Sequence, residues 1–246
     1  MIRLVDPYRV KASKPKTKVI IASSTRQGTA LRQEDAVQIF EDECVVISDG
    51  LSASLHGDIA SKIAAETALW AYKHIRLHPS FWVDKKLFMK RIFRSSNLAV
   101  WQKLREKECE GGAQTTLTVA IVGPMNVWIG QAGDTGVFLY REGNMKQVTS
   151  FDRTPDGLPK HTLGEKRLGL VHEFRSEEFL PHDVLILFSD GAWEHMNNTI
   201  LKSAAQNTGG SQASLSTAAE VLLDAVMKRG GKSNMSIVLI KKLPAS

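Results

Sequence analysis

The chain has 246 residues, of which 43% are hydrophobic and 24% are charged. This usage is close to the average for globular proteins, so it excludes a collagen, a coiled coil and an intrinsically disordered chain. The 32 Lys and Arg against 26 Asp and Glu give a formal charge of +6. No zinc-finger spacing or aromatic-interleaved basic strand accompanies this charge, and we therefore expect no nucleic-acid partner.

The sequence carries no evident targeting or membrane-spanning signal. The longest apolar runs, such as residues 184–188, are far shorter than the ~20 residues that cross a bilayer. The first residues hold no continuous apolar stretch of the kind found in secretory signals. Cys44 and Cys109 are too few for a disulfide framework. These features predict a cytoplasmic protein without a membrane partner.

The predicted elements fall into groups. Residues 1–18 read as a basic, Pro-containing extension, and residues 19–246 as a single domain. In chain order the patterns predict three strands (19–23, 36–40, 44–48), two helices (58–76, with Asp58 as N-cap, and 85–107), three strands (115–122, 126–133, 136–142), an irregular segment (150–170), the segment 171–179, a buried strand (184–188), a helix (213–229) and a last strand (235–240). This grouping favours an α+β protein or a sandwich over alternating βα units.

Acidic residues stand at the ends of several predicted strands. Asp35 begins one strand, and Asp49, Asp134 and Asp190 follow others, two of them directly before Gly. Glycine lets the backbone turn sharply, so such carboxylates can project from a rigid scaffold into one site. Several carboxylates in one site stay ionised only when cations neutralise them. Oxygen ligands suit Mg²⁺ or Mn²⁺ rather than Zn²⁺, and two such ions would activate a water and clamp a phosphoryl oxygen.

At this point the chain resembles a known family, the type 2C metal-dependent protein serine/threonine phosphatases, in a bacterial style. The resemblance rests on ordered motifs: QED (33–35), VVISDG (45–50), GGAQTTLTVAIV (111–122), GQAGDTGVFLYREG (130–143), LILFSDGAWE (185–194) and NMSIVLI (234–240). It implies an α+β fold, a four-layer αββα sandwich in which two central, mostly antiparallel β-sheets are flanked by helix pairs. It also implies a centre of two Mn²⁺ or Mg²⁺ ions at one end of the sandwich.

The resemblance assigns roles to the strand-end residues. Asp49 would bridge the two ions, and the backbone carbonyl of Gly50 would bind one of them. Glu34 would help to hold that same ion, directly or through water, and Asp190 would ligate the other, first ion. Asp35 would orient metal-bound waters. The reaction implied is hydrolysis of phosphoserine or phosphothreonine by a metal-activated water, without a covalent phosphoenzyme.

Two further positions concern the number and strength of the metal sites. Asp134, Asp190 and Glu194 match the residues that form a weaker third metal site in the family. Ser233 stands where the family has an Asp that ligates the first ion, and a neutral hydroxyl is a poorer ligand for a hard cation. Serine in place of aspartate at position 233 is therefore expected to weaken binding of the first metal ion.

Phosphate capture is the second departure from the family pattern. Ala30 occupies the position where an Arg is expected, and Arg26 and Arg32 flank it. Either Arg is long enough to reach a phosphate and make bidentate contacts, and either could equally be a surface residue. A basic cluster in the irregular segment is interpreted as solvated surface charge, with contact to a phosphorylated substrate as the alternative: Arg153, Lys160, Lys166 and Arg167.

These observations predict a hydrolase, a protein serine/threonine phosphatase, whose partners are a phosphorylated protein and a cognate serine/threonine kinase. The alternative is a pseudophosphatase that binds phosphoproteins or a kinase without turnover, and Ser233 favours it. The retention of five clustered carboxylates favours catalysis, because each is costly when it is not neutralised. They are Glu34, Asp35, Asp49, Asp134 and Asp190.

Overall fold

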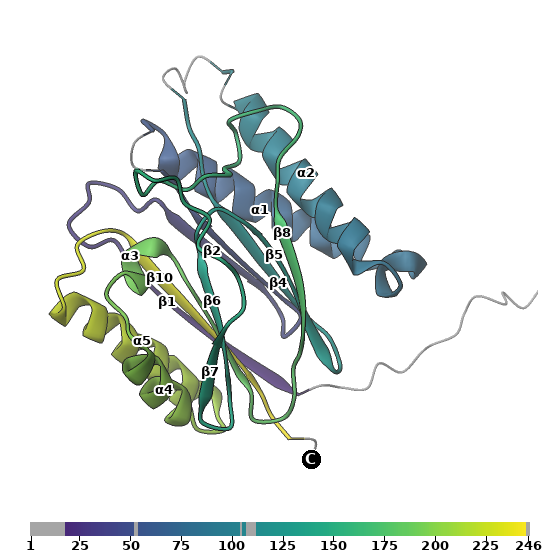
Figure 1. Ribbon diagram of the computed structural model, residues 1–246. Helices are drawn as coiled ribbons and strands as arrows, with labels where there is room; N and C mark the ends of the chain where they lie inside the picture. The colour runs from purple at the N-terminus through teal and green to yellow at the C-terminus, as the bar shows by residue number, and fades with distance from the viewer. Residues whose placement is uncertain (1–17, 52–53, 104, 107–111, 245–246) are drawn as a thin grey trace, which may run out of the picture.

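The computed structural model describes residues 18–51, 54–103, 105–106 and 112–244. The predicted basic extension, apart from Lys18, lies outside the described residues, as does Cys109. Within them two β-sheets face each other and helices cover the outer face of each sheet (Figure 1). This α+β, four-layer αββα sandwich is the predicted fold class.

Each sheet has five strands, and neighbouring strands are antiparallel. One sheet consists, in order, of β1 (Val19–Arg26), β10 (Met235–Lys242), β9 (Val184–Phe188), β6 (Gly136–Arg141) and β7 (Asn144–Gln147). The other consists of β2 (Asp35–Phe40), β3 (Cys44–Asp49), β4 (Leu117–Val122), β5 (Asn126–Ala132) and β8 (Glu173–Glu178).

Two helix pairs form the outer layers. The pair on the β2–β8 sheet is α1 (Gly57–Ile75) and α2 (Lys85–Lys103), joined by the short helix η1 (Pro79–Trp82). The pair on the β1–β7 sheet is α4 (Asn198–Gln206) and α5 (Gln212–Lys228), and the single turn α3 (Asp190–Trp193) precedes them. No helix in the described part of the chain is long and apolar enough to span a bilayer.

The core explains why the central strands are continuously apolar. In β3, Val45 and Ile47 pack between the two sheets, whereas Cys44 and Val46 point to the α1 and α2 side. Successive side chains of a strand point to opposite faces, so a strand covered on both faces is apolar at every position. Each such Val or Ile contributes about 1.5–3 kcal/mol of burial.

The structure corrects several details of the prediction: the helix predicted for 85–107 ends at Lys103, and the short helices η1 and α3 were not predicted. Helix α1 begins at Gly57, and His56 is its N-cap without a side-chain bond, so Asp58 lies in the first turn and is not the cap. Strand β7 and helix α4 were not predicted. Helix α4 has only nine residues, but its apolar residues Ile200, Leu201, Ala204 and Ala205 recur at helical spacing, so the sequence carried a periodic signal for it. Its Asn197 cap, which accepts a hydrogen bond from Ile200 N, was a second signal.

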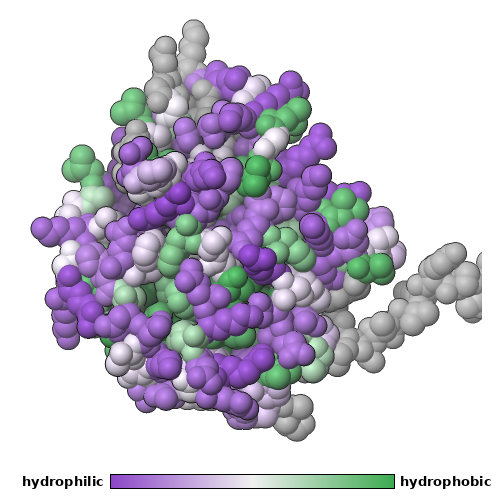
Figure 2. Space-filling model, in the orientation of Figure 1, coloured by the Kyte–Doolittle hydropathy of each residue, from purple (hydrophilic) through white to green (hydrophobic). Residues whose placement is uncertain are grey.

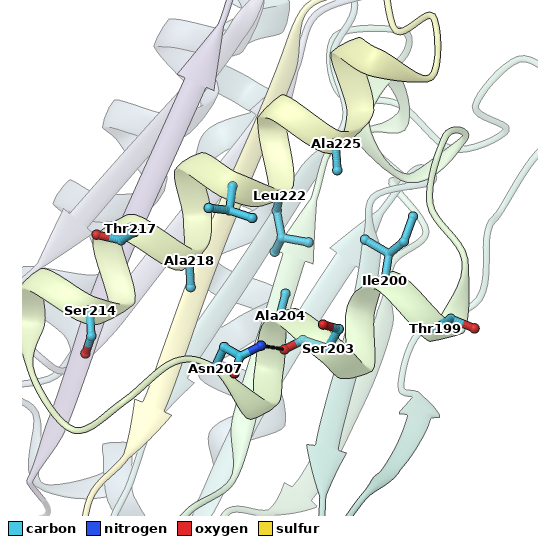
Figure 3. Close-up of a pocket in the computed structure, with 11 residues that line it drawn as sticks. Thr199, Ile200, Ser203, Ala204, Asn207, Ser214, Thr217, Ala218, Leu222 and Ala225 are labelled. Carbon is cyan, nitrogen blue, oxygen red and sulfur yellow. Dashed lines mark hydrogen bonds between the residues drawn. The ribbon is translucent and has the colours of Figure 1, made fainter.

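The surface offers an apolar groove that shares no lining residue with the cavity at the acidic strand ends. A cavity of about 610 Å³ lies between α4 and α5, where Ala218 and Leu222 face Ile200 and Ala204 (Figure 3). Among the described residues, no acidic residue, His or Cys lines it. The rest of the face seen in Figure 2 is mostly hydrophilic, with scattered apolar residues. The carboxylates that carry the predicted chemistry therefore lie in a different site.

Candidate metal centre

Strand ends from both sheets meet at one end of the sandwich. Register pairs Asp35, the first residue of β2, with Asp49, the last residue of β3. Asp134 lies in the connection from β5 to β6, and Asp190 follows β9 and begins α3. Because neighbouring strands are antiparallel, the start of one strand and the end of its neighbour lie at the same end of a sheet. The structure thus brings together the four Asp residues that the sequence singled out.

Burial and repulsion from neighbouring carboxylates raise the pKa values of three of these four carboxyls. Burial raises the pKa of Asp35 to about 6, and the charge of Asp190 adds to the shift. The pKa of Asp49 lies well above its ordinary value because of burial and of nearby Asp35 and Asp190. Burial and Asp190 likewise raise the pKa of Asp134 to about 6. The cluster therefore favours any cation that would neutralise it.

Hydrogen bonds fix the carboxylate of Asp35 and leave one of its oxygens open. Ser189 Oγ donates to Asp35 Oδ2 at 2.8 Å, and the same Oγ accepts a bond from Ser236 N at 2.9 Å. Asp35 Oδ1 is buried and has no hydrogen-bond partner among the described residues. A buried acceptor without a partner is uncommon in a native protein and here fits an ion or an ion-bound water.

Close backbone packing places Gly50 beside Glu34. Gly50 N donates to Glu34 O at 2.9 Å, which joins the end of β3 to the start of β2. A Cβ on Gly50 would lie 2.2 Å from the carbonyl oxygen of Gly57, so no larger residue fits at 50. A Cβ on Gly57 would lie 3.1 Å from Glu34 Oε1, so the Glu34 carboxylate lies against the first residue of α1.

Ser233 and Asn234 form one wall of the site. Both line a cavity of about 170 Å³ together with Asp49, Gly50, Leu51, Thr116, Gly157, Leu158, Pro159 and Asp190. Asn234 holds the wall in place, because its side chain accepts from Glu34 N at 2.8 Å and donates to the carbonyls of Gln27 and Arg32. The hydroxyl at 233 thus stands at the cavity where the family resemblance expects a carboxylate.

Arg153 reaches the third group of predicted ligands. Its guanidinium contacts Asp134 Oδ2 at 2.5 Å, Glu194 Oε1 at 2.7 Å and Asp190 Oδ2 at 3.1 Å. The interpretation of Arg153 as solvated surface charge was wrong. Its side chain is 21% exposed, and it lies inside the acidic cluster. No periodic signal in the segment 150–170 could have revealed this destination.

The residues present fit ions at Asp49 better than a third ion. Among the described residues, no group of three or more His, Cys, Asp and Glu side chains could hold a metal ion. That finding concerns side chains of those four types. Mg²⁺ and Mn²⁺ are commonly held by one or two carboxylates, backbone carbonyls and several waters. Asp49, Asp190 and the carbonyl of Gly50 offer such a donor set. The residues of the predicted third metal site, Asp134, Asp190 and Glu194, already hold the Arg153 guanidinium.

The two candidate phosphate-binding arginines lie differently. Arg26 contacts Glu220 at 3.0 Å and Asp224 at 2.6 Å, both on α5. Arg32 lies 3.5 Å from Asp58 in the first turn of α1, and its side chain is 61% exposed. Neither contacts the strand-end carboxylates, so the structure does not bring them into the cluster.

Comparison with known proteins gives this arrangement a family. A family model described as protein phosphatase 2C matches residues 23–233. The chain belongs to this family. The predicted resemblance to type 2C phosphatases is thereby confirmed, and so is the predicted class of enzyme, a protein serine/threonine phosphatase, at the level of the family. Nothing in the relatives' names supports a binding module without turnover.

Individual relatives of this phosphatase 2C chain are distant. It is 23% identical over 231 residues to the serine/threonine phosphatase stp of Listeria welshimeri, covering 85% of this chain and 90% of that protein. It is 23% identical over 225 residues to the probable protein phosphatase 2C 28 of Arabidopsis thaliana, covering 79% of this chain and 64% of that protein. The catalytic domain of the phosphatase PstP, solved with two manganese ions, has the same fold at a TM-score of 0.74, with 20% identity, 92% of this chain and 99% of that chain.

Proposed function

We propose that this chain hydrolyses phosphoserine and phosphothreonine in proteins at a centre of two Mn²⁺ or Mg²⁺ ions built around Asp49. One observation carries the proposal: Asp35, Asp49 and Asp190 meet at the strand ends beside a cavity of about 170 Å³. The raised pKa values of Asp35 and Asp49 indicate a deficit of positive charge at that point. Membership of the phosphatase 2C family supports the same reaction.

The ligand roles are those that the family resemblance implies, and the positions of the donors support them. Asp49 interacts with both Asp35 and Asp190 and is the carboxylate that would be shared by both ions. Asp190 would hold the first ion, and the carbonyl of Gly50 with Glu34 would hold the second. When bound, such ions supply an activated water and a positive clamp on the phosphoryl oxygens.

Asp35 would orient the attacking water. Ser189 fixes one of its oxygens, and the buried oxygen Oδ1, which has no partner among the described residues, is left as an acceptor. A carboxylate fixed on one side and open on the other holds a water in one orientation. Asp35 is therefore the outer partner that aligns the nucleophile.

Arg32 is the better candidate for phosphate binding. Arg26 is engaged by two carboxylates of α5, whereas the long contact of Arg32 to Asp58 is exposed. Exposed ion pairs of this kind contribute about 0–1 kcal/mol, so Arg32 can leave its partner at little cost. The substrate is a phosphorylated protein, and the kinase that phosphorylates it is the further partner we expect.

Phosphate release from a phosphothreonine peptide across a Mn²⁺ titration tests the proposal. We expect turnover that requires Mn²⁺ and falls by at least about 100-fold in Asp49→Asn, since loss of even an outer partner of a metal ligand typically costs 10–100-fold. Arg26→Gln serves as the matched control for Arg32→Gln, which we expect to raise KM selectively. Absence of turnover at every Mn²⁺ concentration would replace the enzyme by the phosphoprotein-binding alternative.

A further inference from the structure

Arg153 is surrounded by three carboxylates from two separate segments. Its Nε donates to Asp134 at 2.5 Å, its Nη1 to Glu194 at 2.7 Å, and its Nη2 to Asp190 at 3.1 Å. Asp134 precedes β6, whereas Asp190 and Glu194 lie at the two ends of α3. Three nitrogens of one planar group thus each donate to a different acid, which is the use of a guanidinium that Lys cannot reproduce.

Aromatic packing builds the place that this guanidinium occupies. The Arg153 guanidinium carbon lies 4.7 Å from the ring centre of Trp193, and Trp193 stacks on Phe151 with 3.9 Å between ring centres. Trp193 Nε1 also donates to Asp134 O at 3.1 Å. The ring is therefore fixed relative to the acids, and Arg153 is held by a cation–π contact as well as by charge.

We propose that Arg153 is the resident cation of Asp134, Asp190 and Glu194, and that it excludes a divalent ion there. The oxygens that accept from the guanidinium are those that an ion would need, and an ion would place like charges in contact. The chain would then bind two divalent ions instead of the three that the family resemblance predicts. The number two rests on the proposed function, whereas the exclusion at this triad does not.

The contact between Arg153 and Asp190 also links two parts of the cavity lining beside Asp49, namely the loop of Leu158 and Pro159 and the carboxylate of Asp190. The backbone of Arg153 forms a β-bridge with Pro159, and Thr154 N donates to Leu158 O at 2.8 Å. Leu158 and Pro159 line the cavity that Asp49 and Asp190 also line. Because Asp190 is a proposed ligand of the first ion, Arg153 is a positioning residue: it holds that carboxylate and the loop above it.

Counting bound Mn²⁺ tests this assignment without any measurement of activity. Free Mn²⁺ is measured by electron paramagnetic resonance in titrations up to millimolar concentration, on the full chain. We expect two bound ions in the wild type and three in Arg153→Gln. The added ion should disappear in the double variant Arg153→Gln/Glu194→Gln. Arg153→Lys, which keeps the charge, should stay at two.

Matched variants keep the result interpretable. Arg141→Gln removes an Arg that is also held by acids, Asp183 and Glu178, and should add no ion. Glu194→Gln alone should keep the wild-type count, because no ion uses Glu194 while Arg153 is present. Thermal unfolding without Mn²⁺ confirms that each variant is folded.

The outcomes separate this inference from the proposed function. Three ions in the wild type, a lower count in Glu194→Gln, or no added ion in folded Arg153→Gln would each overturn the assignment of Arg153. No ion in the wild type and one in Arg153→Gln would support the assignment and refute the two-ion centre of the proposed function.

Discussion

Buried carboxylates are treated in opposite ways at the two ends of the sandwich. Asp183 precedes β9, and its side chain, 2% exposed, accepts from Arg141 Nε at 3.0 Å, Arg141 Nη2 at 2.7 Å and Leu180 N at 2.7 Å. At the other end of β9, Asp190 joins Asp35 and Asp49, and Asp35 keeps an oxygen without a partner among the described residues. We call the Asp183 end complete, because the protein's own groups satisfy its buried carboxylate. We call the Asp190 end incomplete, because its buried carboxylates need a bound ligand. Incomplete polar sites of this kind are where function is found.

The largest effect on stability should come from relieving the incomplete end. The pKa of Asp35 in the folded chain is about 6, above its ordinary value of 3.8. Such a group favours the folded state below about pH 4, and this contribution is lost as the pH rises through 6. In metal-free protein at pH 7, Asp35→Asn should therefore raise the free energy of unfolding by about 2–3 kcal/mol.

Urea unfolding of wild type and Asp35→Asn at pH 4 and pH 7, both with a chelator, measures this effect. The gain should be present at pH 7 and nearly absent at pH 4, where the wild-type carboxyl is already protonated. Added Mn²⁺ should remove the advantage, because the ion neutralises the wild-type cluster. An equal gain at both pH values would mean that charge is not the cause.

The same substitution at the complete end should have the opposite sign. Asp183→Asn removes the charge that Arg141 pairs with, and one of the three hydrogen bonds loses its acceptor. Arg141 is one third exposed, so water replaces part of the lost interaction. We expect a loss of about 2 kcal/mol in unfolding free energy, with Mn²⁺-dependent turnover unchanged. A gain in stability here would erase the contrast between the two ends.

The sequence predicted the acidic end better than it predicted the loop above it. Asp35, Asp49 and Asp190 could be grouped because each stands at one end of an apolar run. Asp35 opens its strand and Asp49 closes the next, and antiparallel register brings those two ends together. The predicted N-cap, Asp58, was wrong by two residues, because His56 precedes the first helical residue, Gly57. Boundaries of this kind depend on caps that several nearby residues could supply.

Arg153 could not be predicted for a different reason. It is 19 residues beyond Asp134, in a segment without periodicity, and its direction depends on tertiary contacts. His161 pairs with Asp152, and the backbone of Arg153 forms an antiparallel β-bridge with Pro159, so the chain reverses direction between these residues. Composition identified the segment as basic, but only the path of the backbone decides which of its basic side chains reaches the carboxylates at the strand ends.

The smallest of these effects concerns Ser233, where the incomplete end lacks a carboxylate that the family pattern includes. Ser233→Asp adds a charged oxygen to the wall of the cavity, next to Asp49 and Asp190. We expect about tenfold tighter Mn²⁺ binding at the first site, which corresponds to about 1.4 kcal/mol. The same charge should lower the unfolding free energy of the metal-free protein by about 1 kcal/mol, because it lies near Asp49, whose pKa is already raised. Isothermal titration with Mn²⁺ and urea unfolding with a chelator measure the two changes. Ser233→Asn is the control, because Asn is similar in size to Asp but neutral.

Tighter Mn²⁺ binding together with lower metal-free stability would extend the contrast between the two ends, since each added acid makes this end more dependent on its ligand. Unchanged Mn²⁺ affinity in folded Ser233→Asp would place residue 233 outside the metal centre.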